Sequence, residues 1–439
     1  MSSEKRGADN GARDLDARTR TRAIGAAQAK VFTESRLKRG YGEEALDGLL
    51  RRHNETTHDD PIRVVIDAVA DHADNMAGPV LIVRGELLVW DEDVMAARSA
   101  LESAAVEVAV ADLVTPRVRR LVVKVDTSNA QSGSQLRAAA EVVRNAGLRV
   151  SANHVLPFSP WWFKADASPE PSPLILAPRP FDSAKGAGVN VAVIDTGLDD
   201  QASVRTDQWL ADIVGDADPG SLGPTPNLGA AGGHGTFVAG IIRQVAPGCT
   251  VKVYRALDAD GVGGEVQVAQ AILKAAADGA DVINLSLGGS TLFGDPPLAI
   301  EDALANIPQR VQVVAAAGND GSFTPTWPAA FKRVVSVGAL EYEMTPSPYS
   351  NRGPWVDVST VGSGAVSTFV SGTEADGEVF AGDSPCAVWS GTSFAAPQVA
   401  GLLAVLLADG IEPLSAVPAL LAVGQPRPNF GSALRILDW

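Results

Sequence analysis

The stretch GTSFAAPQVAG, residues 391–401, determines how the rest of this sequence is interpreted. It places Ser393 in a Gly-Thr-Ser turn at the start of an apolar helix that we expect from Ala395 to about Ala408. There the hydroxyl group would lie among free backbone N–H groups at the positive end of a helix dipole, which suits a nucleophile. A serine at a helix start is more often only a cap. Other motifs of the chain decide between the two interpretations.

The composition indicates a globular protein of two or three domains, because 439 residues exceed one ordinary core. The net charge is −16, and it is concentrated in residues 181–439, which carry 12 Lys and Arg against 27 Asp and Glu, or 12 − 27 = −15. Such acidity argues against nucleic acid as a partner and favours cationic peptides or metal ions.

Two further features bear on the cellular compartment. The first thirty residues contain no apolar run of the kind that a secretory signal needs, and the apolar run at 402–407 is too short to span a bilayer. Cys249 and Cys386 are too few for a disulfide framework and match no metal motif, which indicates buried or idle thiols. We therefore expect a cytoplasmic protein without a membrane partner.

The N-terminal half divides into three parts. Residues 1–60 are predicted to form a basic, flexible tail with one helix near 43–52. Residues 61–156 are predicted to form a small α/β domain, and residues 157–180, rich in Pro, Ser and Ala, an extended linker. Within the small domain we expect a helix at 61–75, a hairpin of 80–83 and 87–90, a helix at 91–110, a strand at 121–125, a helix at 135–145 and a strand at 148–156.

Three polar side chains in the C-terminal half follow or begin apolar segments. Asp195 ends a buried strand, at the carboxyl edge of a parallel sheet where α/β sites collect. His234 begins an apolar helix and is the only imidazole after residue 180, because the other four histidines precede it. Asn319 follows the apolar strand at 313–317. Singly, Asp195 and Asn319 could be ordinary turn residues.

Taken together with Ser393, these residues supply every group that acyl transfer needs. Ser393 would be the nucleophile and His234 the general base. Asp195 would orient the imidazole and stabilise its charged form, and Asn319 would donate to an oxyanion. Any acid–base chemistry near neutral pH in this half would depend on His234.

The four segments resemble those of the subtilisin-like (subtilase) serine proteases. The motifs are IDTG at 194–197, GHGT at 233–236, AGN at 317–319 and GTSFAAP at 391–397, and they follow the family's order of Asp, His and Ser. The resemblance covers roughly residues 185–410. It implies a doubly wound parallel sheet in residues 181–439, peptide-bond hydrolysis by Asp195, His234 and Ser393, an oxyanion donor at Asn319, and no required cofactor.

Further segments resemble the family's substrate-binding walls. Ser286, Leu287 and Gly288 match the strand beside the primary pocket, and Gly261 and Gly263 match the edge strand that pairs with an extended peptide. The alternative for both is a glycine-rich turn after a buried strand. Asp320, directly after Asn319, lies near the expected primary pocket.

The chain also departs from the family pattern. Residues 241–248 run almost directly from the expected His234 helix into the next strand, where many subtilisins have a calcium-binding loop, and this weakens the case for calcium there. Gln398 stands where the family often has His. Neither departure touches the four chemical residues.

Two classes of function compete for this fold. One is a serine endopeptidase acting on protein or peptide substrates, either broadly or as a dedicated maturation protease for one precursor. The other is a non-catalytic subtilase-fold binding protein. Residues 61–156 would serve as an inhibitory prodomain, which loosely resembles the propeptide fold of many subtilases, or as a docking domain for a regulatory partner.

Overall fold

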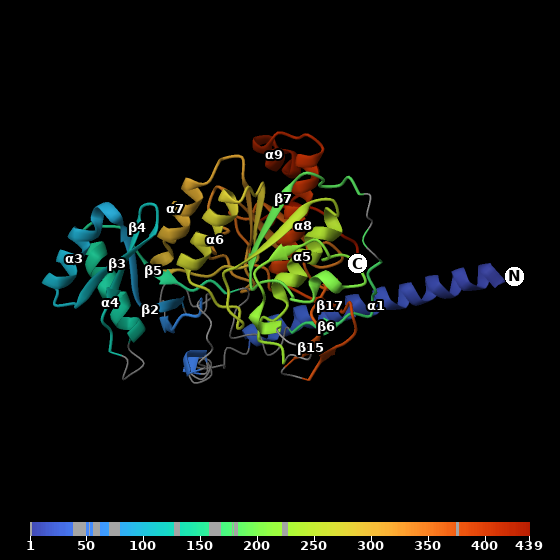
Figure 1. Cartoon of the computed structure of the whole chain (residues 1–439), viewed down its shortest axis with the longest axis horizontal. Helices are drawn as coiled ribbons and strands as arrows, with labels where there is room; N and C mark the ends of the chain where they lie inside the picture. Colours follow the sequence, from blue (N-terminus) through green and yellow to red (C-terminus); the bar gives the residue numbers. More distant parts are fainter. Residues whose placement is uncertain are drawn as a thin grey trace.

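A computed structural model gives the architecture of the chain and separates it into a small unit (62–156), a larger unit (183–439) and an N-terminal helix (Figure 1). The structure describes residues 2–37, 50–51, 53–55, 62–69, 80–126, 132–157, 168–177, 179, 183–221, 227–374 and 377–439.

Strand β7 (Asn190–Asp195) lies inside a nine-stranded sheet at the centre of the larger unit. Residues 191–194 are apolar and buried, which is typical of a parallel strand covered on both faces. The strand order is β18-β19-β13-β12-β11-β10-β7-β9-β8, and β18 alone runs antiparallel to its neighbour. The other strands are β8 (Val214–Gly215), β9 (Thr250–Arg255), β10 (Val282–Leu285), β11 (Gln312–Ala316), β12 (Val334–Leu340), β13 (Val358–Val361), β18 (Gln425–Arg427) and β19 (Gly431–Ala433).

The sheet reverses its winding direction beside β7. The chain passes from β7 to β9 on one side and then crosses over to β10 on the other side of β7. In open α/β sheets, ligands bind at the carboxyl ends of the strands at such a switch point. Asp195, the last residue of β7, therefore lies where a site is expected.

Helices cover both faces of this sheet, which confirms the doubly wound fold. Helices α6 (Glu265–Ala277) and α7 (Leu298–Asn306) pack together on one face, and α5 (His234–Val245) and α8 (Thr392–Ala408) pack on the other (Figure 1). Helix α8 is apolar on all sides, as its sequence predicts, and its first ten residues are buried in the core. Helix α9 (Pro413–Val423) follows it.

The small unit is a five-stranded antiparallel sheet with two helices. Helices α3 (Val94–Ser103) and α4 (Ser132–Asn145) lie on one side of the sheet, and α6 and α7 of the larger unit lie on the other (Figure 1). The helix predicted at 135–145 and the strand at 148–156 are confirmed by α4 and β5. The strands are β1 (Ile66–Val69), β2 (Val80–Trp90), β3 (Val108–Thr115), β4 (Val118–Val123) and β5 (Val150–His154), in the order β1-β2-β4-β3 with β5 on β2.

Three local predictions for the small unit were wrong. The expected hairpin is the single strand β2, because Gly85, at φ +73°, accommodates an irregularity in its pairing with β5 without reversing the chain. The helix expected at 91–110 is helical only over Asp91–Ser103, after which β3 pairs with β4. The helix expected at 61–75 contains strand β1, because its β-branched run pairs with β2, and residues 70–79 lie outside the described part.

The flexible tail predicted over residues 1–60 was also wrong for most of its described part. Residues Ser2–Leu37 form helix α1, and Thr21, Gln28 and Ala29 are buried. Charge and polarity suggested a tail, but the small residues on one face of this helix allow it to pack against the larger unit. Of the helix expected near 43–52, only residues 50–51 lie within the described part, and both are helical.

The described part of the Pro-rich segment lies along the larger unit. Strand β6 (Glu170–Pro171) pairs antiparallel with β17 (Cys386–Trp389), which in turn pairs with β14 (Ala365–Thr368). Residues 158–167 lie outside the described part.

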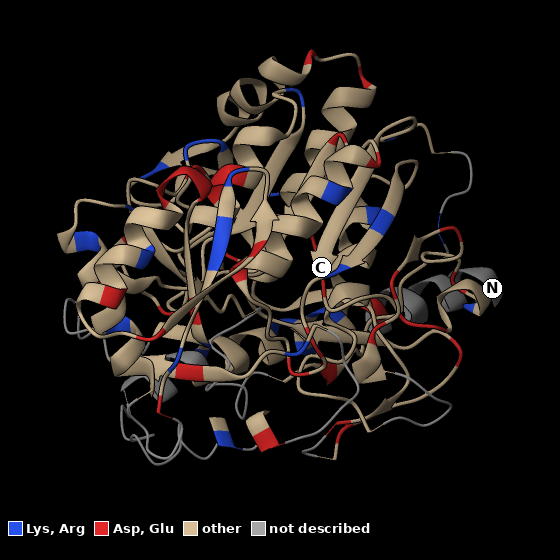
Figure 2. Cartoon of the chain, turned by 60° about the vertical axis from the view of Figure 1, so that its left-hand side comes forward, with Lys and Arg blue, Asp and Glu red and all other residues tan. Residues whose placement is uncertain are grey.

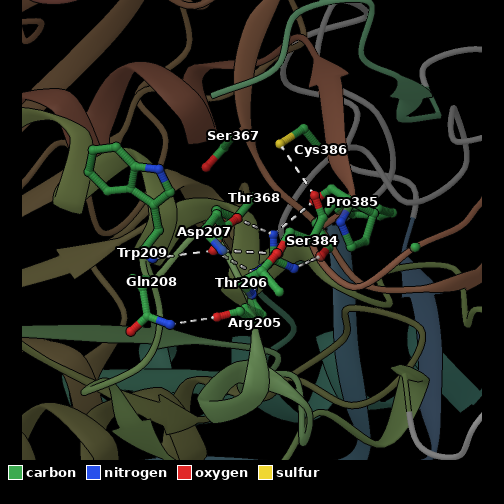
Figure 3. A network of polar contacts seen from close by, with 12 residues as sticks. Arg205, Thr206, Asp207, Gln208, Trp209, Ser367, Thr368, Ser384, Pro385 and Cys386 are labelled. Carbon is green, nitrogen blue, oxygen red and sulfur yellow. Dashed lines mark hydrogen bonds and ion pairs between the residues drawn. The ribbon is translucent and has the colours of Figure 1, made fainter. Parts of the chain in front are cut away.

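A buried arginine joins the loop after β7 to the segment before β17. The guanidinium of Arg205 pairs with Asp207 at 2.7 Å and donates to the carbonyls of Phe369 and Pro385 at 2.6 and 3.0 Å (Figure 3). Because the Arg205 side chain is nearly inaccessible, this charge is stable only with such partners. The loop that begins at Asp195 is therefore held against residues 369–385.

Charge and hydropathy follow the sequence expectations. Figure 2 shows Lys and Arg scattered among Asp and Glu, without a continuous basic band in the part of the chain that is described. Among the described residues, no helix has both the length and the apolar content needed to cross a bilayer. Cys249 is buried and Cys386 half-buried, and both are free thiols.

Candidate active site

Asp195 and His234 meet at the carboxyl edge of the sheet. The Nδ1 atom of His234 lies 2.7 Å from Oδ1 of Asp195, and both side chains are fully buried. The turn after Asp195 can approach helix α5 this closely because Gly235 has no side chain, since a Cβ there would lie 2.2 Å from the carbonyl oxygen of Gly197. The structure thus brings together the two residues that the sequence predicts to act as base and orienting carboxylate.

Aromatic rings hold the imidazole against helix α8. The ring centroid of His234 lies 5.4 Å from that of Trp389, at 87°, and 5.5 Å from that of Phe394. Phe394 directly follows Ser393, and Trp389 lies four residues before it. The packing therefore fixes the imidazole beside the turn that carries the expected nucleophile.

Asp218 is a site residue that the sequence reasoning missed. Its Oδ2 atom accepts from the Gly233 N–H at 2.7 Å and from Thr196 Oγ1 at 3.2 Å, so it connects the residue after Asp195 with the residue before His234. Burial raises the pKa of Asp218 to about 6, although these donors and Gly220 N–H favour the charged form. No local pattern could have identified it, because its partners come from two distant turns.

The Ser393 turn is bound to the end of β10 through Ser286. Ser393 Oγ lies 3.1 Å from the Ser286 carbonyl oxygen, and Ser286 Oγ donates to the Ser393 carbonyl at 2.8 Å. Ser286 and Ser393 are both buried. The Ser286 side chain, predicted to line the substrate pocket, therefore supports the Ser393 backbone.

Asn319 accepts two hydrogen bonds from the same turn. Its Oδ1 atom accepts from the backbone N–H and the hydroxyl of Thr392, each at 2.9 Å. Because two donors occupy Oδ1, the orientation of the amide is determined and Nδ2 points elsewhere. A Cβ on Gly391 would lie 3.5 Å from that Nδ2, so the amide nitrogen lies beside the Ser393 turn.

Comparison with known proteins agrees with this geometry. The profile of the subtilase family matches residues 186–415. The chain belongs to the subtilase family. The relatives named below are called a serine proteinase and a serine protease.

Two curated relatives and one solved structure illustrate the similarity. The chain is 36% identical over 245 residues to the thermophilic serine proteinase of Bacillus sp. (strain AK1), covering 52% of this chain and 55% of that protein. It is 31% identical over 253 residues to the intracellular serine protease of Paenibacillus polymyxa, covering 53% and 71%. The crystal structure of fervidolysin from Fervidobacterium pennivorans matches with a TM-score of 0.57 and 19% identity, covering 84% of this chain and 62% of that one, which shows the shared fold. The chain thus spans about half the length of the first relative.

The expected substrate-binding segments of this subtilase lie on both sides of residues 155–157. Leu156 N–H donates to the Gly263 carbonyl at 2.8 Å, and Gly288 N–H donates to the Pro157 carbonyl at 3.0 Å. Val155 forms an antiparallel bridge with Gly264. Gly263 and Gly288 therefore both hydrogen-bond to an extended segment of the chain itself.

The remaining predicted site residues have other surroundings. The Leu287 side chain is buried in the core, and Gly261, at φ +76°, forms a turn in which its N–H donates to Asp258. Asp320 is half-buried, and its N–H donates to Asn351 Oδ1 at 3.0 Å. Gln398 donates from Nε2 to the carbonyls of Val361 and Phe394, at 2.6 and 2.8 Å, and so secures helix α8.

One group of potential metal ligands occurs among the described residues. His53, Asp258 and Asp260 place their ligand atoms within 4.8 Å of one another. Arg63 donates to Asp258 and Asp260 at 3.4 and 3.0 Å, so a guanidinium already pairs with both carboxylates. Calcium takes six to eight oxygen ligands, so this group does not fit it. In the loop where many subtilisins bind calcium, only residues 246–249 separate α5 from β9.

Proposed function

We propose that this subtilase is a serine endopeptidase that cleaves protein or peptide substrates. The observation that carries the proposal is the joint placement of the Asp195–His234 pair, the Ser393 turn and the Asn319 amide at one switch point of the sheet. The proposed reaction uses all four of these side chains, and the chain has all four.

In the proposed mechanism, Ser393 Oγ attacks the scissile carbonyl carbon and His234 Nε2 takes the hydroxyl proton. Asp195 holds Nδ1 of the imidazole and stabilises the cation that forms. The oxyanion receives hydrogen bonds from Asn319 Nδ2 and the Ser393 backbone N–H. His234 then gives the proton to the leaving amine, and water releases the acyl group by the same steps.

Chemical labelling tests this assignment. A fluorophosphonate should modify Ser393, and the Ser393→Ala variant should lose both the label and peptide cleavage while keeping its fold. Peptide mapping of the labelled protein identifies the modified residue. Labelling at another serine would refute the assignment of the nucleophile.

We further propose that the small unit is a prodomain that keeps the site closed. Its last residues, 155–157, pair with Gly263–Gly264 and with Gly288, which is how an extended peptide adds to exposed strand edges. Leu156 is completely buried there. Residues 155–157 therefore occupy the cleft that a substrate would enter, and the unprocessed chain would be a zymogen.

Polar contacts support a specific fit between the prodomain and the larger unit. His154 Nδ1 lies 2.8 Å from Glu265 Oε2, and both groups are buried. The Leu292 N–H donates to His154 Nε2 at 2.9 Å. Asp302, also buried, accepts from Thr115 Oγ1 and from Arg117. Such buried contacts are satisfied only when the two units dock in this orientation.

We also propose that the enzyme acts in the cytoplasm. The support is the similarity to a relative named an intracellular serine protease. A peptidase in that compartment needs restraint, which agrees with a closed cleft. Fractionation of the source cells with an antibody against the chain tests the location, and recovery outside the cell would contradict it.

A further inference from the structure

Helix α1 comes before the prodomain in the sequence but packs against the larger unit. In Figure 1 it runs past β17 and β6, and its N-terminal part extends beyond the rest of the molecule. Its buried residues Thr21, Gly25, Gln28 and Ala29 recur every three or four positions and so form one stripe of the helix. The helix thus has a specific docking face.

Two glycines allow the helix backbone to reach the larger unit. A Cβ on Gly25 would lie 2.5 Å from Cα of Gly364, and a Cβ on Gly364 would lie 3.3 Å from the Thr21 carbonyl oxygen. Gly364 also has φ +68°, which favours glycine. The helix therefore lies directly on the turn that precedes β14.

Gln28 connects this helix to the strand that leads to the nucleophile. Its Nε2 group donates to the carbonyls of Val388 and Ser168, at 3.2 and 3.1 Å, and its Oε1 atom accepts from Ser390 Oγ at 2.7 Å. Ser390 Oγ in turn accepts from the Gly364 N–H at 2.9 Å. Gln28 and Ser390 are each only 3% exposed, so these bonds are shielded from water.

Ser390 immediately precedes the turn at 391–393. Gly391 N–H donates to the Gly362 carbonyl at 3.0 Å, so the segment is held on one side by residues 362–364 and on the other by Gln28. We propose that Gln28 is a positioning residue for Ser393 and that helix α1 is an N-terminal brace of the active site. This inference rests on the proposed peptidase function.

The test compares Gln28→Met with the control Ala27→Met, which changes an exposed neighbour on the same helix. Both are made in the full chain and assayed after self-cleavage is complete, with the N-terminal fragment left in the sample. Activity is expressed as kcat per active site titrated with a fluorophosphonate. We expect Gln28→Met to lower kcat by roughly tenfold with little change in KM, because small displacements of a nucleophile are costly. Ala27→Met should match the wild type.

A second variant, Ser390→Ala, removes the hydroxyl that donates to Gln28 and accepts from the Gly364 N–H. It should lower kcat by a similar factor. The fold-decrease in kcat of the double variant Gln28→Met/Ser390→Ala should be smaller than the product of the fold-decreases of the two single variants. This cycle separates positioning from general destabilisation, because a merely structural role would change Tm and leave kcat per titrated site intact.

The outcomes are distinguishable. If Gln28→Met and Ser390→Ala keep wild-type kcat, the brace is refuted while the peptidase proposal stands. If Gln28→Met does not fold, Ser390→Ala alone decides. A wild-type protein that hydrolyses no peptide and leaves Ser393 unlabelled would refute the peptidase proposal, and the brace with it.

Discussion

Pro397 lies one helical turn after Ser393 and has no N–H to donate to the Ser393 carbonyl. That carbonyl instead accepts a hydrogen bond from Ser286 Oγ at 2.8 Å, and Asn284 Nδ2 donates to the same Ser286 oxygen at 2.9 Å. A proline inside the first turns of α8 therefore frees a carbonyl through which β10 holds the turn of the expected nucleophile.

This relationship predicts the effect of Ser286→Ala on stability. The substitution leaves the buried Ser393 carbonyl without its donor and should destabilise the protein by about 1–3 kcal/mol. Pro397→Ala restores an N–H at that position, so Ser286→Ala should cost less in the Pro397→Ala background. Urea unfolding, done on Ser393→Ala proteins to prevent self-cleavage, measures both. If Ser286→Ala destabilises the protein equally in the two backgrounds, the Ser393 carbonyl accepts a hydrogen bond from another donor.

Asn319→Ala should lower kcat by roughly 10²–10³, because one oxyanion donor is lost while substrate binding is retained. Steady-state kinetics on a peptide substrate measure kcat and KM separately. Loss of the Asn319 side chain also removes the acceptor of two Thr392 bonds, so Tm is measured as a control. A change confined to KM would count against the oxyanion role.

Asp218 predicts a pH dependence of stability. Its pKa is raised to about 6 in the folded protein, above the value of about 3.9 for an unfolded chain. Its contribution to stability is therefore fully present below about pH 4 and lost as the pH rises through about 6. Relative to Asp218→Asn, the parent should lose on the order of 3 kcal/mol between pH 4 and 7. Unfolding curves of both proteins in the Ser393→Ala background measure this, and a difference that is constant with pH contradicts it.

The sequence sufficed to propose Asp195, His234, Asn319 and Ser393 as site residues, because each carries a local signal. Asp195 and Asn319 end apolar strands, and His234 and Ser393 begin apolar helices, so the rules for strand ends and helix starts place all four at one edge of the sheet. The structure has these elements at the expected residues. The four motifs also occur in the order that is known from the subtilase family.

The rest of the site depends on contacts between distant segments. Helix α1 looked like a tail because its docking face consists of small and polar residues, Thr21, Gly25 and Gln28, whose partners in the larger unit are more than 300 positions away. The pairing of β2 with three other strands likewise overrode the turn suggested by Gly85. The sequence around one position cannot identify contacts with residues that lie far away in the chain.

Acidic charge near the expected primary pocket predicts a preference for basic substrates. Asp320 follows the oxyanion residue, and the chain beyond residue 181 is strongly acidic. Peptides with Lys or Arg near the scissile bond should be cut faster at low salt, because opposite charge increases capture and salt screens it. Profiling a peptide library at two ionic strengths, with Asp320→Asn for comparison, measures the effect. Indifference to basic residues would mean that these carboxylates only keep the surface soluble.

The prodomain proposal predicts self-cleavage in the Pro-rich segment. Under this proposal residues 155–157 occupy the substrate cleft, because they hydrogen-bond to Gly263 and Gly288. The wild-type protein should therefore cut itself between about residues 157 and 185, whereas Ser393→Ala should remain full length. Mass spectrometry of the two purified proteins gives the masses and the cleavage position.

Leu156→Asp tests whether the same segment blocks the cleft. A carboxylate at this fully buried position is unfavourable, so the segment should leave the cleft and peptide cleavage should begin without the lag of the wild-type protein. Met95→Asp, a change at a 66% exposed position on helix α3 of the same unit, is the matched control and should keep the lag. If the wild-type protein cleaves peptides at full rate while uncut, and Leu156→Asp changes nothing, the small unit is a recognition module, because an occupied cleft would have delayed the first turnover.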